Sequence, residues 1–365
     1  WTTTGLLYWT SGSADHGVRR IDSLANPRIV RRFGYFSRAA GVFVLLLGLL
    51  VLVGWTLDIG VLKSILPGFV SMKANTALAF IFSGAALLLL PPGPAVAWRR
   101  NLALASAGAV AVLGLANLAE YLCGLDLGID QLFFRDPQLS PVPPGRMAVT
   151  TALSFLLLGI SLLFLLRNGK RNRYAVQRFC AVVVFFSFLA VVGYLYNAQS
   201  LYAFGSYSAM ALHTAVVFVV LSLGVLCVRL DRGIMAVVLS DGIAGEMLRH
   251  LLPAIVVLNV GVGRLLLGGF HFDEFEDAYL IALVVSLNTV VSVYLISLSA
   301  WSQYRTEARR KQAEAARDRA LADLRDSERL LNEAQEISMA GGWEVDVDTR
   351  LVKWTAETEV LQFAS

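Results

Sequence analysis

The sequence predicts an all-α membrane protein with eight transmembrane helices, followed by a cytoplasmic helix and the first part of an α/β domain. Of its 365 residues, 56% are hydrophobic and only 16% are charged, whereas a soluble domain carries about 25% charged residues. The apolar residues gather in eight long segments, and the composition turns abruptly charged after Trp301. Because lipid solvates such a surplus of apolar surface and water does not, we expect the chain to reside in a membrane.

Eight apolar segments have about the 20 residues that a helix needs to cross the hydrocarbon core of a bilayer. Backbone groups find no water there, so each segment is predicted to be a helix that satisfies its own hydrogen bonds. The predicted spans are residues 40–57, 71–90, 102–122, 147–166, 179–196, 209–228, 251–268 and 279–301. The even number of spans predicts that both termini lie on the same side.

Three of the spans begin with the same six-residue motif, which consists of Met, two variable residues, a polar residue, Thr and Ala. The motif occupies residues 72–77, 147–152 and 210–215. Each copy follows an apolar span and an outer loop, so residues 40–230 are predicted to form three copies of one helical hairpin. Residues 251–302 lack the motif and are predicted to form a separate last hairpin.

Two further segments are not predicted to cross the membrane. Residues 1–39 are basic and are interpreted as a cytoplasmic N-terminal segment that sets the topology and contacts anionic lipid. Residues 231–250 are apolar but are interrupted by Ser240-Asp-Gly. This connector is predicted to form a short interfacial helix and a turn.

Lys and Arg residues are strongly biased to the even-numbered loops and the two terminal segments. Five of the 31 basic residues fall on the opposite side, and the other 26 share the favoured side. The five exceptions are Lys63, Lys73, Arg135, Arg146 and Arg264. Short loops rich in basic residues stay in the cytoplasm, so both termini are predicted to be cytoplasmic.

Residues 303–338 contain no Gly or Pro and are rich in Ala, Glu, Arg and Leu, which predicts a water-exposed helix that continues the last span. A thin stripe of small and apolar residues at a/d spacing, from Ala313 to Ala334, favours a parallel coiled coil and therefore a homodimer. A lone solvated helix is the alternative. Either helix can carry a shift or rotation into the cytoplasm.

Residues 339–365 have a different pattern. The Gly341-Gly342 pair is expected to end the helix, and the alternation from Trp343 to Trp354 around a polar turn predicts a β-hairpin. Thr355 then precedes a helical pattern as a candidate cap. This order predicts the beginning of an α/β domain.

Several of these stretches resemble a known family. Leu324-Arg-Asp-Ser-Glu-Arg-Leu, Ala340-Gly-Gly-Trp-Glu-Val-Asp and Val352-Lys-Trp-Thr-Ala-Glu are similar to the linker and first hairpin of PAS domains in bacterial sensor histidine kinases. The membrane region resembles the multi-pass regions that precede such domains, through Gly193-Tyr-Leu-Tyr, Met210-Ala-Leu-His-Thr-Ala, Leu239-Ser-Asp-Gly, Leu251-Leu-Pro and Gly263-Arg-Leu. The resemblance covers about residues 40–365.

The resemblance implies a sensor in the bacterial inner membrane that passes a membrane or periplasmic stimulus to a downstream kinase or response regulator, or in some relatives to a diguanylate cyclase. The chain lacks the phosphoacceptor His box, the ATP-binding Asn and Gly boxes and a GGDEF-type loop, and Asp273-Glu-Phe-Glu is predicted to lie in an outer loop. We therefore predict no catalytic residue, and expect kinase activity from a further C-terminal region or a partner.

The repeated motif supplies the candidate binding residues, which would lie in the outer third of three spans. They are Asn75, Thr76, Thr150, Thr151, His213 and Thr214. If the hairpins pack with pseudo-threefold symmetry, these polar groups converge on one sensing pocket, because polar groups at membrane depth seek a partner or a water-filled site. The simpler interpretation, which we favour, is that the Thr hydroxyls bond to their own helices and that Asn75 and His213 link helices.

No cofactor is predicted. The three cysteines are scattered, and of the four histidines only His213 and His271 share the outer side, so haem or metal binding at His213 is disfavoured. An ion pair is expected between Arg264 and the acidic outer loop at Asp273 and Glu274. Glu120 is interpreted as a carboxylate that seeks the membrane interface, and nothing in the sequence predicts nucleic-acid binding.

Two other classes of function remain open at this point. A small-solute transporter would suit repeats that carry polar residues within the membrane, although charged residues within the spans are few. A non-catalytic membrane subunit would use the hairpins to dock onto a larger complex. The leading hypothesis is the sensor module of a two-component histidine kinase.

Overall fold

The computed structural model describes most of the chain between residues 27 and 354. The described residues are 27–65, 69–90, 96–132, 134, 144–167, 172–198, 201–202, 208–228, 234–240, 242–269, 275–338, 343–345 and 352–354. For residues 27–30, 173, 266–269, 275–278, 335–338 and the two strands, only the backbone is described. The chain divides into one unit up to Gln303 and a second from Tyr304 onward.

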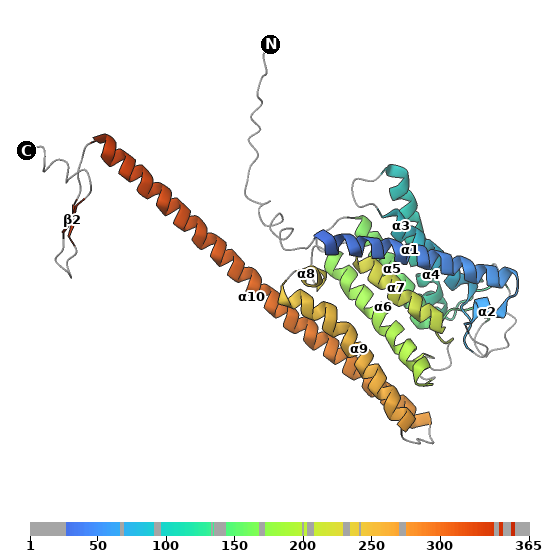
Figure 1. Cartoon of the computed structure of the whole chain (residues 1–365). Coiled ribbons are helices and arrows are strands. Elements are labelled where there is room, and N and C mark those ends of the chain that lie inside the picture. The colour runs from blue at the N-terminus through green and yellow to red at the C-terminus, as the bar shows by residue number, and fades with distance from the viewer. Residues whose placement is uncertain are drawn as a thin grey trace, which may run out of the picture. The chain divides into compact units, whose positions relative to one another are not determined.

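The described residues include ten α-helices and two strands (Figure 1). The helices are α1 (Pro27–Thr56), α2 (Gly60–Lys63), α3 (Ala74–Leu89), α4 (Ala97–Cys123), α5 (Val149–Leu166), α6 (Asn172–Leu195), α7 (Leu212–Leu226), α8 (Ile234–Leu239), α9 (Ile243–Gly269) and α10 (Phe275–Ser338). The strands are β1 (Trp343–Val345) and β2 (Val352–Trp354).

The chain has the helices of a multi-pass membrane protein. Among the described residues, six helices are long and apolar enough to cross a membrane, namely α1, α4, α5, α6, α9 and α10, while α3 and α7 are shorter apolar helices. At 1.5 Å per residue the 16 residues of α3 extend about 24 Å, less than the roughly 30 Å of a hydrocarbon core. All eight predicted spans are helical, but eight crossings remain a prediction.

Two predicted boundaries differ from the observed ones. Helix α1 begins at Pro27 and not near residue 40, so part of the basic N-terminal segment belongs to the first helix. Helix α9 begins at Ile243 and not at residue 251, so the second half of the predicted connector belongs to this helix. The short helix predicted in the connector is α8.

A closed ring of three hairpins is formed by α1, α3, α4, α5, α6 and α7. Helices α3, α5 and α7 contact one another at the centre, and α1, α4 and α6 lie outside them. Each outer helix packs against the inner helix of its own hairpin and also against the inner helix of the preceding hairpin, with α1 closing the ring against α7. This pseudo-threefold order agrees with the repeat in the sequence.

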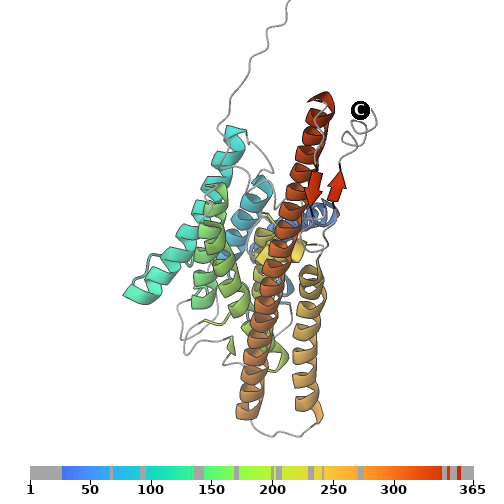
Figure 2. The same ribbon diagram turned by 90° about the vertical axis from the view of Figure 1, so that its left-hand side faces the viewer.

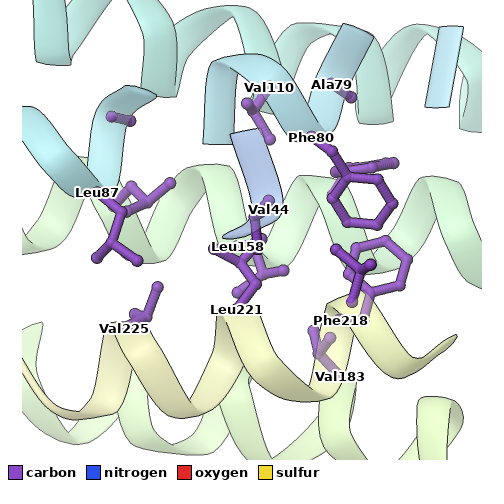
Figure 3. Packing of buried hydrophobic residues seen from close by; sticks show 14 of the residues in the cluster. Val44, Ala79, Phe80, Leu87, Val110, Leu158, Val183, Phe218, Leu221 and Val225 are labelled. Atoms are coloured by element: carbon purple, nitrogen blue, oxygen red, sulfur yellow. The ribbon is translucent and has the colours of Figure 1, made fainter. Parts of the chain in front are cut away.

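The core along this ring is built from equivalent residues of the three inner helices. Phe80, Phe155 and Phe218 are fully buried, and their ring centroids lie 4.8 to 4.9 Å apart. Further layers follow along the same helices, with Leu158 opposite Leu221 and then Leu87 near Val225 (Figure 3). Side chains therefore fill the axis of the ring.

Small residues let each outer helix approach its inner partner closely. In the outer helices they recur seven residues apart, as Gly41 and Gly48 in α1, Ala107 and Gly114 in α4, and Cys180 and Ser187 in α6. A Cβ built on Gly48 would lie 2.7 Å from the Ala77 carbonyl oxygen, and one on Gly114 would lie 2.7 Å from the equivalent Ala152 oxygen. Close backbone approach at small residues is typical of helix pairs in membranes.

A hydrogen bond donated by an aromatic side chain connects each outer helix to the start of its inner helix. Trp55 Nε1 donates to the Met72 carbonyl oxygen at 2.9 Å. The Tyr121 hydroxyl donates to the Met147 carbonyl at 2.8 Å, and the Tyr194 hydroxyl donates to the Met210 carbonyl at 2.9 Å. These methionines open the repeated motif, so the repeat extends over both helices of each hairpin.

Each outer helix also ends in the same backbone conformation. Three residues after the aromatic donor, Asp58, Gly124 and Asn197 have φ of 55°, 63° and 57°. Glycine, Asn and Asp are the residue types that adopt this left-handed conformation most readily. The chain therefore turns toward the inner helix in the same way three times.

Helices α9 and α10 run side by side in opposite directions (Figure 2). Asn288 Nδ2 in α10 donates to Asn259 Oδ1 in α9 at 3.0 Å. The end of α6 joins them, because the Tyr196 hydroxyl donates to the Val260 carbonyl at 2.7 Å and Tyr196 packs near Ala282. The last hairpin is therefore attached to the ring through α6.

The part of α10 after Gln303 is solvent-exposed. It carries i,i+4 ion pairs between Arg310 and Glu314 at 2.9 Å and between Arg329 and Glu333 at 3.0 Å. Leu324 and Leu331, which belong to the predicted a/d stripe, are exposed. A coiled-coil dimer would cover them and remains a prediction.

The two strands pair antiparallel, with Trp343 opposite Trp354 and Val345 opposite Val352. This is the β-hairpin that the alternating sequence predicts. Nothing further of residues 339–365 is described, so the assignment of this segment to a PAS domain remains a prediction.

Replacing Gly114 with Ala is expected to destabilise the bundle by about 1–3 kcal/mol, because the added methyl group overlaps the backbone of α5. Gly108 lies in the same helix with nothing within 4 Å of a built Cβ, so Gly108→Ala is the matched control and should leave stability unchanged or raise it. Unfolding in detergent micelles measures both. Equal stability of the two variants would contradict the close contact of α4 with α5.

Candidate functional site

The six polar residues of the repeated motif lie at the beginning of the three inner helices, and five of them are buried. Thr76, Thr151 and Thr214 each precede a core phenylalanine by four residues and so share its helix face. Because the three phenylalanine rings touch, we place these threonines beside the axis of the ring.

Asn75, Thr150 and His213 lie one residue earlier and so about 100° away around each helix. The Asn75 side-chain amide donates to Asp130 Oδ1 at 3.3 Å, and its Oδ1 accepts a hydrogen bond from the Thr76 backbone N–H at 2.8 Å. His213 is buried, and its Nε2 has no hydrogen-bond partner among the described residues. A single pocket for all six residues stays a prediction.

Asn75 leads to a group of charged side chains that we call the buried charge cluster, formed by Glu120, Asp130 and Arg146. Glu120 lies in the last turn of α4, Asp130 in the loop after it, and Arg146 shortly before α5. Their exposed fractions are 1%, 8% and 7%. Buried charges are strongly unfavourable unless they are paired, so their mutual contacts decide whether the loop is stable.

Arg146 is the centre of the cluster. Its Nε donates to Asp130 Oδ2 at 2.7 Å and lies 3.7 Å from Glu120 Oε2. Its Nη2 donates to the Leu125 carbonyl oxygen at 3.4 Å, and the guanidinium lies 5.4 Å from the centroid of the Tyr121 ring. One cation thereby joins α4, the loop and the start of α5.

Glu120 holds the beginning of the same loop. Its Oε1 accepts a hydrogen bond from the Leu127 backbone N–H at 2.9 Å, whereas its Oε2 has no hydrogen-bond partner among the described residues. One turn earlier, the fully buried Asn117 donates to the Leu113 carbonyl, and its Oδ1 also lacks a described donor. This side of the cluster has spare acceptor capacity.

The loop backbone brings Asp130 and Arg146 together at a glycine. Gly145 has φ of 78°, and a Cβ at this position would collide with the Asp130 carbonyl oxygen. Only glycine combines this conformation with so close a contact. The 124–146 loop is therefore positioned tightly at its base.

The cluster contains two carboxylates and one guanidinium, and it is therefore short of positive charge. Burial raises the pKa of the Asp130 carboxyl, and the hydrogen bond and charge of Arg146 oppose this only in part. The exposed Asp126 nearby acts in the same direction as burial. A bound proton, a cation or a hydrogen-bond donor would supply what the cluster lacks.

Among the described residues, only the second hairpin carries this cluster. The positions equivalent to Glu120 in the other hairpins are Gly54 and Gly193, where a Cβ would collide with Leu62 and Tyr202 respectively. The second hairpin instead has a longer loop, because the aromatic donor and the methionine acceptor are 26 positions apart in the sequence, against 17 and 16 in the other hairpins. The carboxylate thus replaces a glycine where the ring is least symmetric.

Asp130 and Arg146 are not predicted as site residues by the sequence, because the identity of a charged residue in a polar loop does not reveal whether the fold buries it. Glu120, which is interpreted as a carboxylate that seeks the membrane interface, is buried within the protein beside Arg146. The available signal was a Gly-Arg pair directly before a repeated motif, opposite a carboxylate at the end of the preceding span.

The remaining predicted site residues lie elsewhere. Arg264 is exposed on α9, and its expected partners Asp273 and Glu274 lie outside the described residues, so this ion pair stays a prediction. Within the described part of the chain, no group of three or more His, Cys, Asp or Glu residues is arranged to hold a metal ion.

Comparisons of the chain with protein-family models, with curated proteins and with solved structures found no match. The chemistry of the site is therefore inferred from its own residues. The buried charge cluster can exchange a proton or bind a small cationic or hydrogen-bonding ligand at one end of the ring.

Removal of the guanidinium in Arg146→Met is expected to lower stability by about 3–5 kcal/mol, because two buried carboxylates would lose their cation. Adding Glu120→Gln and Asp130→Asn to this variant should restore part of the loss, since the uncompensated charges are then gone. Arg100→Met, at an exposed arginine of α4, is the control. Thermal unfolding in micelles measures all three, and a loss no larger than that of the control would contradict the pairing.

Proposed function

We propose that this chain is the membrane sensor module of a bacterial two-component histidine kinase, with eight crossings of the inner membrane and both termini in the cytoplasm. A stimulus at the outer end of the ring would shift α10, and α10 would act on a PAS domain that begins in residues 339–365. The observation that carries the proposal is the 64-residue helix α10, which runs without interruption from an apolar segment into an exposed, charged one.

The two short inner helices fit eight crossings. Non-helical backbone is tolerated at membrane depth where protein covers it and its polar groups are paired. The backbone at Met72, Met147 and Met210 meets both conditions, since these residues are buried and aromatic side chains bind their carbonyls. Each crossing of this kind therefore combines a short helix with a buried extended segment.

The input would act at the buried charge cluster. A proton or ligand that satisfies the spare acceptors of Glu120 would change the balance of charge around Arg146 and the position of the 124–146 loop. Such a ligand shifts the protein only if it binds two arrangements with different affinity. The predicted pocket at the repeated threonines would lie at the same end of the inner helices.

The contact that would pass the change to the last hairpin is the one made by Tyr196. Its hydroxyl bonds the Val260 carbonyl of α9, and a Cβ on Gly263 of the same helix would collide with that hydroxyl. The same added Cβ would also collide with the Val285 side chain of α10. A movement of the outer end of α6 would therefore displace both helices of the last hairpin, α9 and α10.

The filled axis supports a sensor over a transporter. Phe80, Phe155 and Phe218 occupy the centre of the ring with no exposed surface, where a transporter of this symmetry would need its pathway. A docking subunit remains the alternative, and stoichiometric co-purification of a larger complex without any kinase output would favour it.

Changing the helical phase of α10 tests the mechanism. In a fusion of this chain, joined at Ser338, to the PAS and kinase region of a sensor kinase with a measurable output, two Ala residues inserted after Ala316 rotate the following helix by about 200°. This insertion should change the output at least severalfold. Seven inserted residues restore the phase to within about 20° and serve as the control. Output that ignores the phase would contradict transmission through α10.

The proposed orientation can be tested with a native thiol. Cys123 at the end of α4 is exposed, whereas Cys180 and Cys227 are buried. A membrane-impermeant maleimide should therefore label intact spheroplasts through Cys123, and Cys123→Ser should abolish the labelling. Labelling of Cys123 only after permeabilisation would place this end of the ring in the cytoplasm and reverse the topology.

A further inference from the structure

A pocket lies at the end of the ring opposite the buried charge cluster. Its volume is about 590 Å³, and its walls come from the beginning of α1, the ends of α3 and α7 and the first turn of α4. The lining combines three arginines, Arg31, Arg38 and Arg99, with apolar side chains that include Leu88 and Leu90. It lies where α1 closes the ring against α7.

The pocket is strongly positive. Among the described residues, no carboxylate lines it and none of the three arginines forms an ion pair. The free carbonyls at the ends of α3 and α7 oppose this charge with about half a negative charge each. Three full positive charges exceed that sum, so an anion is the favoured occupant.

The apolar part of the lining sets a second requirement. The apolar lining comes from Leu87 and Leu88 of α3, from Leu90 directly after it and from Val228 after α7, so a small hydrated anion would leave apolar surface in contact with water. Gly34 provides room, because nothing lies within 4 Å of a Cβ built on it. An occupant with an anionic head and an apolar body satisfies both sides.

The pocket also lies at the predicted membrane interface, which is where molecules with an anionic head and an apolar body are found. The arginines belong to the basic end of the ring, which is the end predicted to face the anionic cytoplasmic leaflet. Trp98 and Tyr35 are exposed beside the pocket, as aromatic residues are at membrane interfaces. A lipid in the inner leaflet would therefore reach the pocket by moving sideways.

We propose that this pocket binds the headgroup of an anionic glycerophospholipid, with the phosphate held by Arg31, Arg38 and Arg99 and the upper acyl chain against the leucines of α3. The bound lipid joins α1 to α3, α4 and α7 at the closing contact of the ring. This site does not depend on the proposed sensor function.

The test uses the purified full chain in detergent, titrated with phosphatidylglycerol, with phosphatidylcholine and with inorganic phosphate, and followed by native mass spectrometry and thermal unfolding. Phosphatidylglycerol is expected to bind and to raise the unfolding temperature, whereas phosphatidylcholine should do neither. The triple variant with Arg31, Arg38 and Arg99 changed to Gln should bind about 100-fold more weakly, because each arginine that contacts the phosphate contributes about fivefold.

Two further variants separate the pocket from general surface charge. Changing Arg32, Arg100 and Arg178 to Gln removes the same charge from exposed positions outside the pocket and should leave binding within about threefold. Gly34→Trp keeps every charge, fills the pocket and should weaken binding at least tenfold. Equal loss in both triple variants, or unchanged binding by Gly34→Trp, would overturn the proposal. Binding and stabilisation by inorganic phosphate equal to those by phosphatidylglycerol would identify a free-anion site and overturn the lipid assignment.

Discussion

The hydrogen bond from an aromatic side chain to the carbonyl of the repeated methionine is the interaction on which the ring depends. Each inner helix begins two residues after Met72, Met147 or Met210, so a stretch of extended backbone is buried before the helix can satisfy it. An unpaired buried carbonyl costs about 1–3 kcal/mol. Three equivalent donors remove this cost and place each inner helix at the same height, so that the phenylalanines meet on the axis.

The same constraint explains why the outer helices carry small residues at intervals of seven. An aromatic donor in the last turn reaches the methionine carbonyl only when the two helices lie close together along their length. Gly48 and Gly114 allow that approach because any side chain there would overlap a backbone oxygen of the partner helix. Packing and hydrogen bonding therefore act on the same pairs of helices, which is expected where lipid provides no hydrophobic drive for helices to associate.

The second hairpin departs from the threefold symmetry of the ring. Where two hairpins place a glycine, the second has Glu120, and the longer loop that this carboxylate helps to hold carries Asp130 and Arg146 into a buried position. The opposite end of the ring carries three arginines, without an ion pair to any described residue, around a partly apolar pocket. One end is thus short of positive charge and the other has a surplus, and the two ends present different chemistry to the two sides of a membrane.

Composition and periodicity alone determined the helical membrane architecture, the threefold repeat, the short helix in the connector and the charged helix after Trp301, because these depend on how each segment partitions between lipid and water and on local helix propensity. Only the tertiary structure decided which polar residues meet. Thr76 and Asn75 are adjacent in the sequence, yet helix geometry directs one toward the axis and the other to Asp130, 55 residues away. Burial of Arg146 between two carboxylates likewise depends on contacts across the loop, which no local pattern encodes.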